Sequence, residues 1–139
     1  MKTKQPILLL LIIILFSATL AHGQNESKTE KQAIAEYNQS EKELNRIFNL
    51  ILKTYAKDTV FIKKLKESQR LWALSRDADI ELVFPYHKAD PNEYGSMLNA
   101  CKAWELKDIT DERIDYLNQW VEGIDGSGCE GSRKVAGDD

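Results

Sequence analysis

Apolar residues recur at a helical period along most of the chain, and no stretch shows the strict alternation of a strand. We predict a first helix over 34–57, because apolar residues keep this period there, at Ile34, Tyr37, Leu44, Phe48, Ile51, Leu52 and Tyr55. Asp58 and Thr59 can cap a second helix over 60–83, which must end before Pro85. The class predicted from this pattern is all-α.

A third helical segment follows a loop that is rich in proline and polar residues. Gly95-Ser96 opens a predicted helix over 95–107, and a further apolar set predicts a helix over 110–123. The apolar face moves by roughly a quarter turn between the two sets, and Asp108 and Thr110 can both act as N-caps. The sequence leaves open whether this is one kinked helix or two. The predicted fold is an antiparallel helical hairpin plus a kinked or broken third helix, forming a small helical bundle.

The second predicted helix contains the stretch 65–77, LKESQRLWALSRD, which has polar residues on its inward face. Four positions of this stretch share one face of a helix: Leu65, Gln69, Trp72 and Arg76. Buried polar groups need hydrogen-bond partners. A hairpin that turns near residues 57–58 brings the segment 40–45, SEKELN, beside this face. The two segments therefore predict a polar seam within an apolar core.

This seam leads to specific expectations about contacts. We expect Glu41 to accept hydrogen bonds from Arg76 and Asn45 to exchange amide hydrogen bonds with Gln69. The guanidinium of Arg76 can lie on the ring of Trp72, and we expect Trp72 to be among the most buried residues. The simplest role of the seam is to fix the register of two helices, and the alternative is that part of it forms a recognition surface.

The two ends of the chain differ from its middle. Residues 1–23 have the pattern of a signal peptide, with two lysines, the apolar run Ile7–Leu20 and small residues before a cleavage site. This run is shorter than the ~20 residues that span a bilayer, so we expect cleavage rather than an uncleaved anchor. The mature chain then begins at Gln24, with one helical domain over 24–125. The tail 126–139 is rich in Gly, Ser and Asp, and is predicted to be disordered.

The charge of the mature chain restricts its partners. Two of the 19 basic residues leave with the predicted signal peptide while all 22 acidic residues remain, which gives a formal charge of −5. An acidic surface disfavours nucleic acid and anionic lipid, and it suits a cationic protein partner. We expect no membrane insertion after signal cleavage.

The residues that could carry catalysis or bind a metal are few. The mature chain has one histidine, His87, and its two cysteines are too far apart in the sequence to form a CxxC motif, so no metal site or cofactor is expected. There is no HExxH motif, Gly-rich phosphate loop or Ser-His-Asp arrangement, so an enzyme is disfavoured. A straight helix through 101–123 would hold Cys101 too far from Cys129 for a disulfide. We therefore predict unpaired cysteines, with Cys101 buried.

Four segments in order resemble the domain of the LprI-type lysozyme inhibitors: SEKELNRIF, LKESQRLWALSRD, Gly95-Ser96 and TDERIDYL at 110–117. The resemblance covers about residues 30–122. The matching positions, which we interpret as structural, include Glu41, Leu44, Asn45, Gln69, Trp72, Arg76, Asp77 and Arg113. Relatives commonly carry a cysteine in the first helix and another after the Arg-Asp pair. Both are absent here, which is consistent with the loss of a disulfide.

The resemblance implies an exported helical protein without catalytic residues and, for some relatives, inhibition of lysozyme. Our first hypothesis is a periplasmic or secreted binding protein that inhibits a cationic lysozyme. The loop 84–94 is the candidate contact, through Tyr86, His87, Lys88 and Tyr94. The alternative is a structural or adaptor protein of the cell envelope with another protein partner. Exposure of Trp104 or Trp120 in a surface patch would favour a protein partner.

Overall fold

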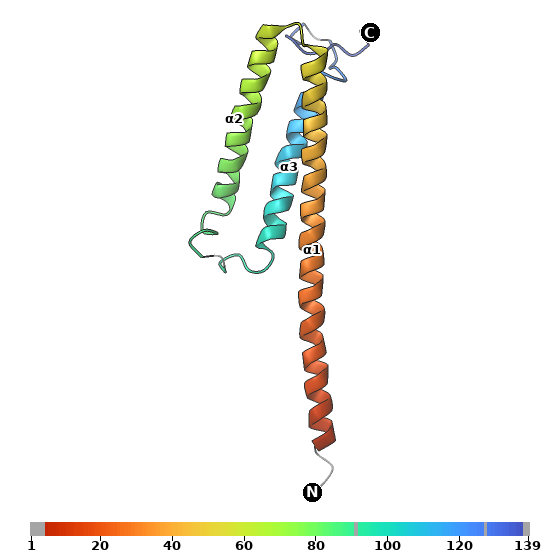
Figure 1. The fold of residues 1–139 in the computed structure, drawn as a ribbon, viewed down its shortest axis with the longest axis vertical. Helices are drawn as coiled ribbons and strands as arrows, with labels where there is room; N and C mark the ends of the chain where they lie inside the picture. Colours follow the sequence, from red (N-terminus) through yellow and green to blue (C-terminus); the bar gives the residue numbers. More distant parts are fainter. Residues whose placement is uncertain (1–4, 91, 127, 138–139) are drawn as a thin grey trace.

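The described part of the chain forms a small bundle of three helices. The computed structural model describes residues 5–90, 92–126 and 128–137, with side chains described from Ser27 onward. The helices are α1 (Gln5–Thr54), α2 (Thr59–Val83) and α3 (Leu98–Asn118), and no named strand occurs in the described part of the chain. The predicted all-α class is confirmed. In Figure 1, α3 runs beside the C-terminal part of α1, and α2 lies on the other side of α3.

The second helix agrees closely with the sequence prediction. Asp58 is its N-cap, and its carboxylate accepts from the backbone N–H of Phe61 at 2.9 Å. The helix ends at Val83, two residues before Pro85, as the missing N–H of proline requires. The first helix ends at Thr54, three residues earlier than predicted.

The third helix differs from its prediction, because α3 is continuous through residues 108–110 and begins only at Leu98. Of the two alternatives that the sequence left open, the structure has a single helix, which ends at Asn118 rather than near residue 123. Thr110 does not act as an N-cap: it is fully buried, and its hydroxyl donates to Oε1 of Glu41 at 3.4 Å. The apolar face of α3 shifts because the helix changes partners along its length. Ala100 and Ala103 pack against α1, whereas Leu117 packs against both α1 and α2.

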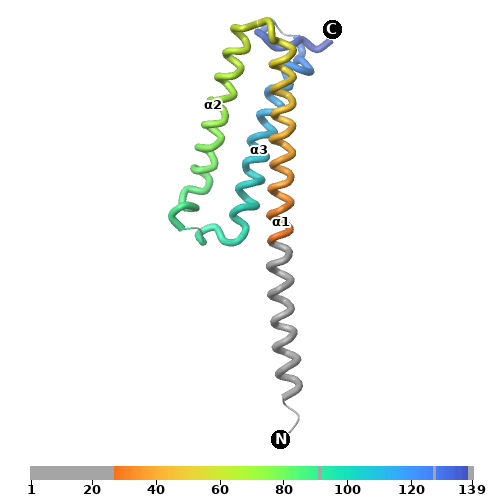
Figure 2. Tube along the Cα trace, viewed as in Figure 1, coloured from red at the N-terminus to blue at the C-terminus, as the bar shows by residue number. Residues whose placement is uncertain are grey.

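The core is built mainly between α1 and α3, and α2 makes fewer contacts with either helix (Figure 2). At one level of the bundle, small residues allow α1 and α3 to approach closely: Ala33, Ala100 and Ala103. The larger cluster lies toward the C-terminal end of α1 and consists of Leu44, Ile47, Ile51, Leu65, Ile114 and Leu117. The predicted hairpin is therefore present, but α3 and not α2 is the principal partner of α1.

The described part of the segment after α3 folds back onto the end of the bundle. Ile124 and Val135 form an isolated parallel bridge, in which the N–H of Ile124 donates to the carbonyl of Lys134 at 2.9 Å. Gly123 permits this turn, since its φ is 93° and a Cβ there would meet the backbone of Ala136 at 2.8 Å. Backbone pairing of this kind leaves no signal in composition.

The predicted signal peptide, residues 1–23, lies outside the residues whose side chains the structure describes. Within the described residues, no helix combines the length and the apolar character that crossing a bilayer requires.

Candidate functional site

The predicted contact loop joins α2 to α3 at one end of the bundle (Figure 1). Two of its four candidate residues point outward. Tyr86 is 61% exposed. The side chain of Lys88 is 72% exposed, and its Nζ lies 2.8 Å from Oε1 of Glu81. The loop therefore presents an aromatic ring and an ammonium group to solvent.

The other two candidates hold the loop in shape. The Nδ1 of His87 lies 2.6 Å from the carbonyl of Phe84, and the His87 side chain is only 13% exposed. The hydroxyl of Tyr94 accepts from the backbone N–H of Tyr86 at 3.2 Å, and its ring packs edge-on against Phe84 at 5.5 Å between centroids. His87 and Tyr94 thus contribute to the conformation of the loop more than to its outer surface.

The polar seam contains the predicted link between α1 and α2. Nη1 of Arg76 donates to Oε1 of Glu41 at 2.9 Å, and the guanidinium carbon lies 5.1 Å from the centre of the Trp72 ring. Both contacts are confirmed. Arg76 gives Glu41 one hydrogen bond rather than two, because its Nε and Nη2 donate to Oδ1 of Asp77 at 3.2 and 3.1 Å.

The predicted exchange between Asn45 and Gln69 is wrong. Nδ2 of Asn45 donates to the backbone carbonyl of Glu41 on its own helix at 2.8 Å. Oε1 of Gln69 accepts from Nε of Arg113 at 3.0 Å. The reason is the position of α3, which brings Arg113 to the face of α2 that a simple hairpin would turn toward α1.

Arg113 is the buried cation of this region, with only 8% of its surface exposed. Its guanidinium lies 5.7 Å from the ring centre of Trp72 and 5.2 Å from that of Tyr116. It also donates to Oγ of Ser68 at 3.0 Å, so its hydrogen-bond acceptors are neutral. Burial lowers the pKa of Arg113, and the Tyr116 hydroxyl opposes this effect.

Trp72 is only half-buried, so the prediction that it is among the most buried residues is wrong. The helix that carries it buries just Leu65 and Ile80. Trp72 instead lines an open groove of about 310 Å³ between α2 and α3, with Asp79, Ile109, Glu112, Arg113 and Tyr116. An inward-facing position on α2 therefore does not guarantee complete burial.

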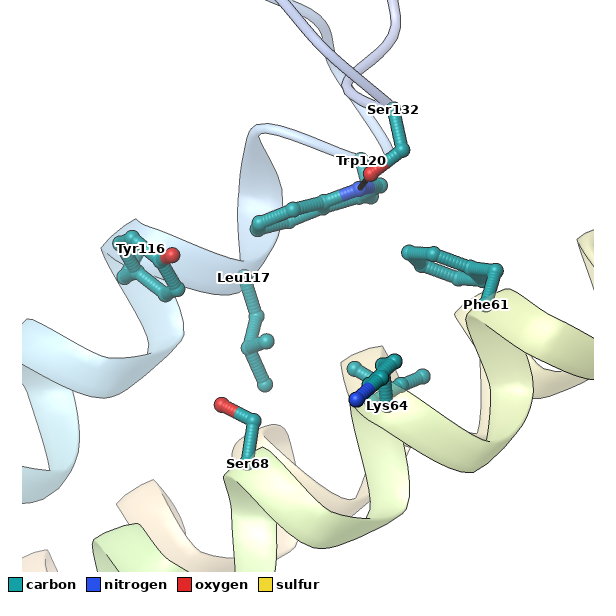
Figure 3. A pocket seen from close by; sticks show the side chains of 8 residues that line it. Phe61, Lys64, Ser68, Tyr116, Leu117, Trp120 and Ser132 are labelled. Carbon is teal, nitrogen blue, oxygen red and sulfur yellow. Dashed lines mark hydrogen bonds between the residues drawn. The ribbon is translucent and has the colours of Figure 1, made fainter.

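A second hollow lies nearer the turn between α1 and α2, and sequence reasoning missed it. It is lined by Phe61, Lys64, Leu65, Ser68, Tyr116, Leu117, Trp120 and Ser132 (Figure 3). The indole N–H of Trp120 donates to Oγ of Ser132 at 3.1 Å, so the C-terminal segment forms one wall. The volume of about 180 Å³ is below the ~300 Å³ at which small-molecule pockets begin.

The tryptophans proposed as indicators of a partner surface are both half-buried. The Trp104 indole N–H donates to Oε2 of Glu36 at 3.2 Å, and Trp120 is covered by the C-terminal segment. Neither ring forms an exposed patch. The exposed apolar residues of the bundle lie mainly on α2 and the start of the following loop.

Polar residues around Glu41 extend the seam further than predicted. Burial raises the pKa of Tyr37; the Arg76 charge opposes this effect and the Glu41 carboxylate adds to it. Nearby, burial alone would raise the pKa of Asp111, but hydrogen bonds from Lys107 and Ser40 outweigh burial and lower it. Ser40 on α1 and Asp111 on α3 thus extend the polar seam to the third helix.

Among the described residues, no three His, Cys, Asp or Glu side chains gather in a way that could hold a metal ion.

A family model described as "Lysozyme inhibitor LprI" matches residues 20–117 of the chain. The chain belongs to the LprI lysozyme inhibitor family. No curated protein and no solved structure shows a significant match. The LprI match runs from within α1 to the last turn of α3 and includes the loop 84–94.

The positions that carry the LprI resemblance are distributed over all three helices. They are Glu41, Leu44 and Asn45 on α1, Gln69, Trp72, Arg76 and Asp77 on α2, and Arg113 on α3. Leu44 is buried in the main core cluster. The side-chain contacts found for Glu41, Gln69, Arg76 and Arg113 are made within the protein. Their structural role stays a prediction.

Both cysteines are free, as predicted, but Cys101 is exposed rather than buried. The prediction of burial is wrong because the neighbouring Ala100 and Ala103 take the positions of α3 that face α1. Cys129 is also exposed, in the segment that follows α3.

The exposure of the two thiols gives a direct test of the structure. We expect the non-reduced protein to take up two maleimide labels without denaturant, because both sulfurs are free and accessible. Mass spectrometry before and after labelling measures this. An unlabelled protein that is two mass units lighter than the reduced chain would reveal a Cys101–Cys129 disulfide and contradict the structure.

Proposed function

We propose that the mature protein is an exported inhibitor that binds lysozyme in the periplasm or outside the cell. The observation that carries this proposal is the LprI family match over residues 20–117, which includes all but one residue of α3 and the whole of α2. The formal charge of −5 on the mature chain supports a cationic partner. The predicted signal peptide supports export to the compartments in which lysozymes act.

The loop 84–94 is the proposed contact with the enzyme. Lysozymes cleave glycosidic bonds with two carboxylates in a cleft. An inhibitor that occupies this cleft needs a projecting segment with a cation for the carboxylates and an aromatic ring for the sugar-binding walls. Lys88 and Tyr86 offer these two groups: the side chain of Lys88 is 72% exposed and Tyr86 is 61% exposed. The contacts of His87 and Tyr94 pre-organise the loop and thereby reduce the entropy lost on binding.

The proposal is tested by measuring lysis of a cell-wall suspension by purified c-, g- and i-type lysozymes. The protein used begins at Gln24, so that it retains every residue whose side chain is described. We expect saturable inhibition of at least one lysozyme type, with an inhibition constant in the micromolar range or below. If none of the three enzymes is inhibited by a large molar excess of the folded protein, the proposed function is wrong.

Two loop variants locate the contact. We expect Tyr86→Ala to weaken inhibition by about 30-fold, as for an aromatic residue at the centre of an interface. Lys88→Ala should weaken it less, by about threefold to tenfold. Asn92→Ala is the matched control, since Asn92 lies in the same loop and its side chain is exposed. Equal inhibition by the Tyr86 and Asn92 variants would remove the loop from the contact while leaving the inhibitory function in place.

A further inference from the structure

The outer face of α2 is unusually apolar for a solvent-exposed helix surface. Only Leu65 and Ile80 of its 25 residues are buried. Four large apolar residues are exposed on it: Val60 at 71%, Leu71 at 51%, Leu74 at 57% and Leu82 at 76%. At 100° per residue these four positions lie within about 80° of one another, on the side away from Leu65. We refer to these four residues as the outer stripe of α2.

The charges beside the outer stripe are divided between the two halves of the helix. Residues 59–70 carry four basic residues against one acidic residue, and residues 71–83 carry three acidic residues against one basic residue. The basic residues that flank the stripe are Lys63, Lys64 and Lys66, and the acidic ones are Asp77, Asp79 and Glu81; all six are exposed. The surface is therefore positive at one end and negative at the other.

We propose that the outer stripe of α2 binds the same stripe of a second copy of this chain, with the two helices antiparallel. The two-fold axis passes near Leu71, in the middle of α2, so that residue i of one copy faces about residue 143 − i of the other. In this arrangement Leu71 and Leu74 of both copies meet at the axis. Val60 of each copy faces Leu82 of the other. The two stripes therefore cover each other, and all four apolar residues of each copy are buried.

The same axis brings opposite charges together. Two contacts, each made twice, connect Lys63 with Glu81 and Lys64 with Asp79 of the other copy. A parallel pair would place like charges beside one another, so the charge pattern selects the antiparallel arrangement. Glu81 already pairs with Lys88 at 2.8 Å. Asp79 has no ion pair within the described residues. The Lys64–Asp79 contact would therefore stabilise the dimer most, because it replaces no existing ion pair of Asp79.

The pairing is independent of the proposed inhibition, because the loop 84–94 stays outside it. α2 is about 37 Å long at 1.5 Å per residue, and antiparallel helices carry their loops at opposite ends. Each dimer would expose two loops, one at each end. The second copy also gives α2 a packing partner that α1 and α3 largely fail to provide.

Sedimentation equilibrium of the protein beginning at Gln24 tests the pairing. We expect the mass of two chains at about 100 μM and dissociation toward one chain on dilution below the micromolar range. Leu74→Glu should give the mass of one chain at every concentration, because two carboxylates would meet near the axis. Leu50→Glu is the control and should remain dimeric, since Leu50 is an exposed leucine of α1. Circular dichroism verifies that each variant keeps its helical content.

A charge exchange tests the orientation of the two helices. Lys64→Asp alone and Asp79→Lys alone should each weaken the dimer by about tenfold, since each change disturbs two contacts. The double variant, which carries both changes, should recover affinity to within about threefold of the original chain. A monomeric protein at 100 μM, a dimer unaffected by Leu74→Glu, or a double variant no better than the single ones would each overturn the proposal. A chain that stays monomeric and binds lysozyme through this stripe would also overturn it.

Discussion

Arg76→Met is expected to lower the free energy of unfolding by about 2–4 kcal/mol. The Arg76 side chain is 15% exposed and bonds Glu41 at 2.9 Å, so its removal leaves a partly buried carboxylate without its cation. The cation–π contact with Trp72 is lost at the same time. Glu41 is 31% exposed and can regain some hydration, which keeps the loss below that for a fully buried pair.

A double-mutant cycle of Arg76→Met with Glu41→Gln separates the free energy of the ion pair from the other effects of replacing Arg76. Urea unfolding of the original chain, the two single variants and the double variant gives the four free energies. We expect the double variant to be less destabilised than the sum of the two single variants by about 1 kcal/mol or more. Strict additivity would mean that the contact at 2.9 Å contributes nothing to stability.

Ile51→Ala should cost about 3–4 kcal/mol, the largest loss among the single core substitutions considered. Ile51 is completely buried and belongs to the cluster that joins all three helices through Leu65 and Leu117. Replacement by alanine removes apolar contacts and leaves a cavity that the rigid α1–α3 pair cannot close. For a domain of this size, the corresponding fall in Tm is roughly 12–25 °C.

The neighbouring residue supplies a matched control for this substitution. Leu50 lies on the same helix and is 36% exposed, so Leu50→Ala should cost about 1 kcal/mol or less. Thermal unfolding followed by circular dichroism at one protein concentration measures both variants. Similar melting temperatures for the two would show that the core does not lie on the Ile51 side of α1.

The parts of the fold that the sequence predicted correctly depend on short-range signals. The start of α2 follows from the carboxylate of Asp58 and its end from Pro85. The Glu41–Arg76 contact follows from the length of the turn between two helices of known period. These features are set by residues close in sequence or by one simple geometric rule, so local patterns were sufficient.

The errors share a different cause, which is the position of α3. In a simple hairpin of two helices Asn45 would lie against Gln69. In the structure Arg113 of α3 donates a hydrogen bond to Gln69 instead. Trp72 remains half-buried because α2 stands away from α1 and borders a groove. Thr110 looked like a cap and is instead a buried donor to Glu41. Each depends on a long-range contact that no local pattern encodes.

The position of the candidate loop was predicted from its prolines and polar residues. The roles of the individual loop residues were not predicted. Tyr86 and Tyr94 are the same residue type eight positions apart. In the structure Tyr86 is exposed, while the Tyr94 hydroxyl accepts from the Tyr86 backbone and its ring packs on Phe84. Which tyrosine faces solvent depends on the path of the loop, and the sequence alone did not give that path.

The preference of α1 for α3 also determines when the fold can form. All of α2 and the following loop separate these two helices in the chain, so the main core cannot assemble until α3 has been synthesised. A nascent chain that ends at Val83 contains α1 and α2 but lacks Ile114 and Leu117, which complete the core cluster. In such a chain the apolar residues of α1 lack the partner helix that covers them in the complete fold. We therefore expect the main core to form only after α3 has been synthesised.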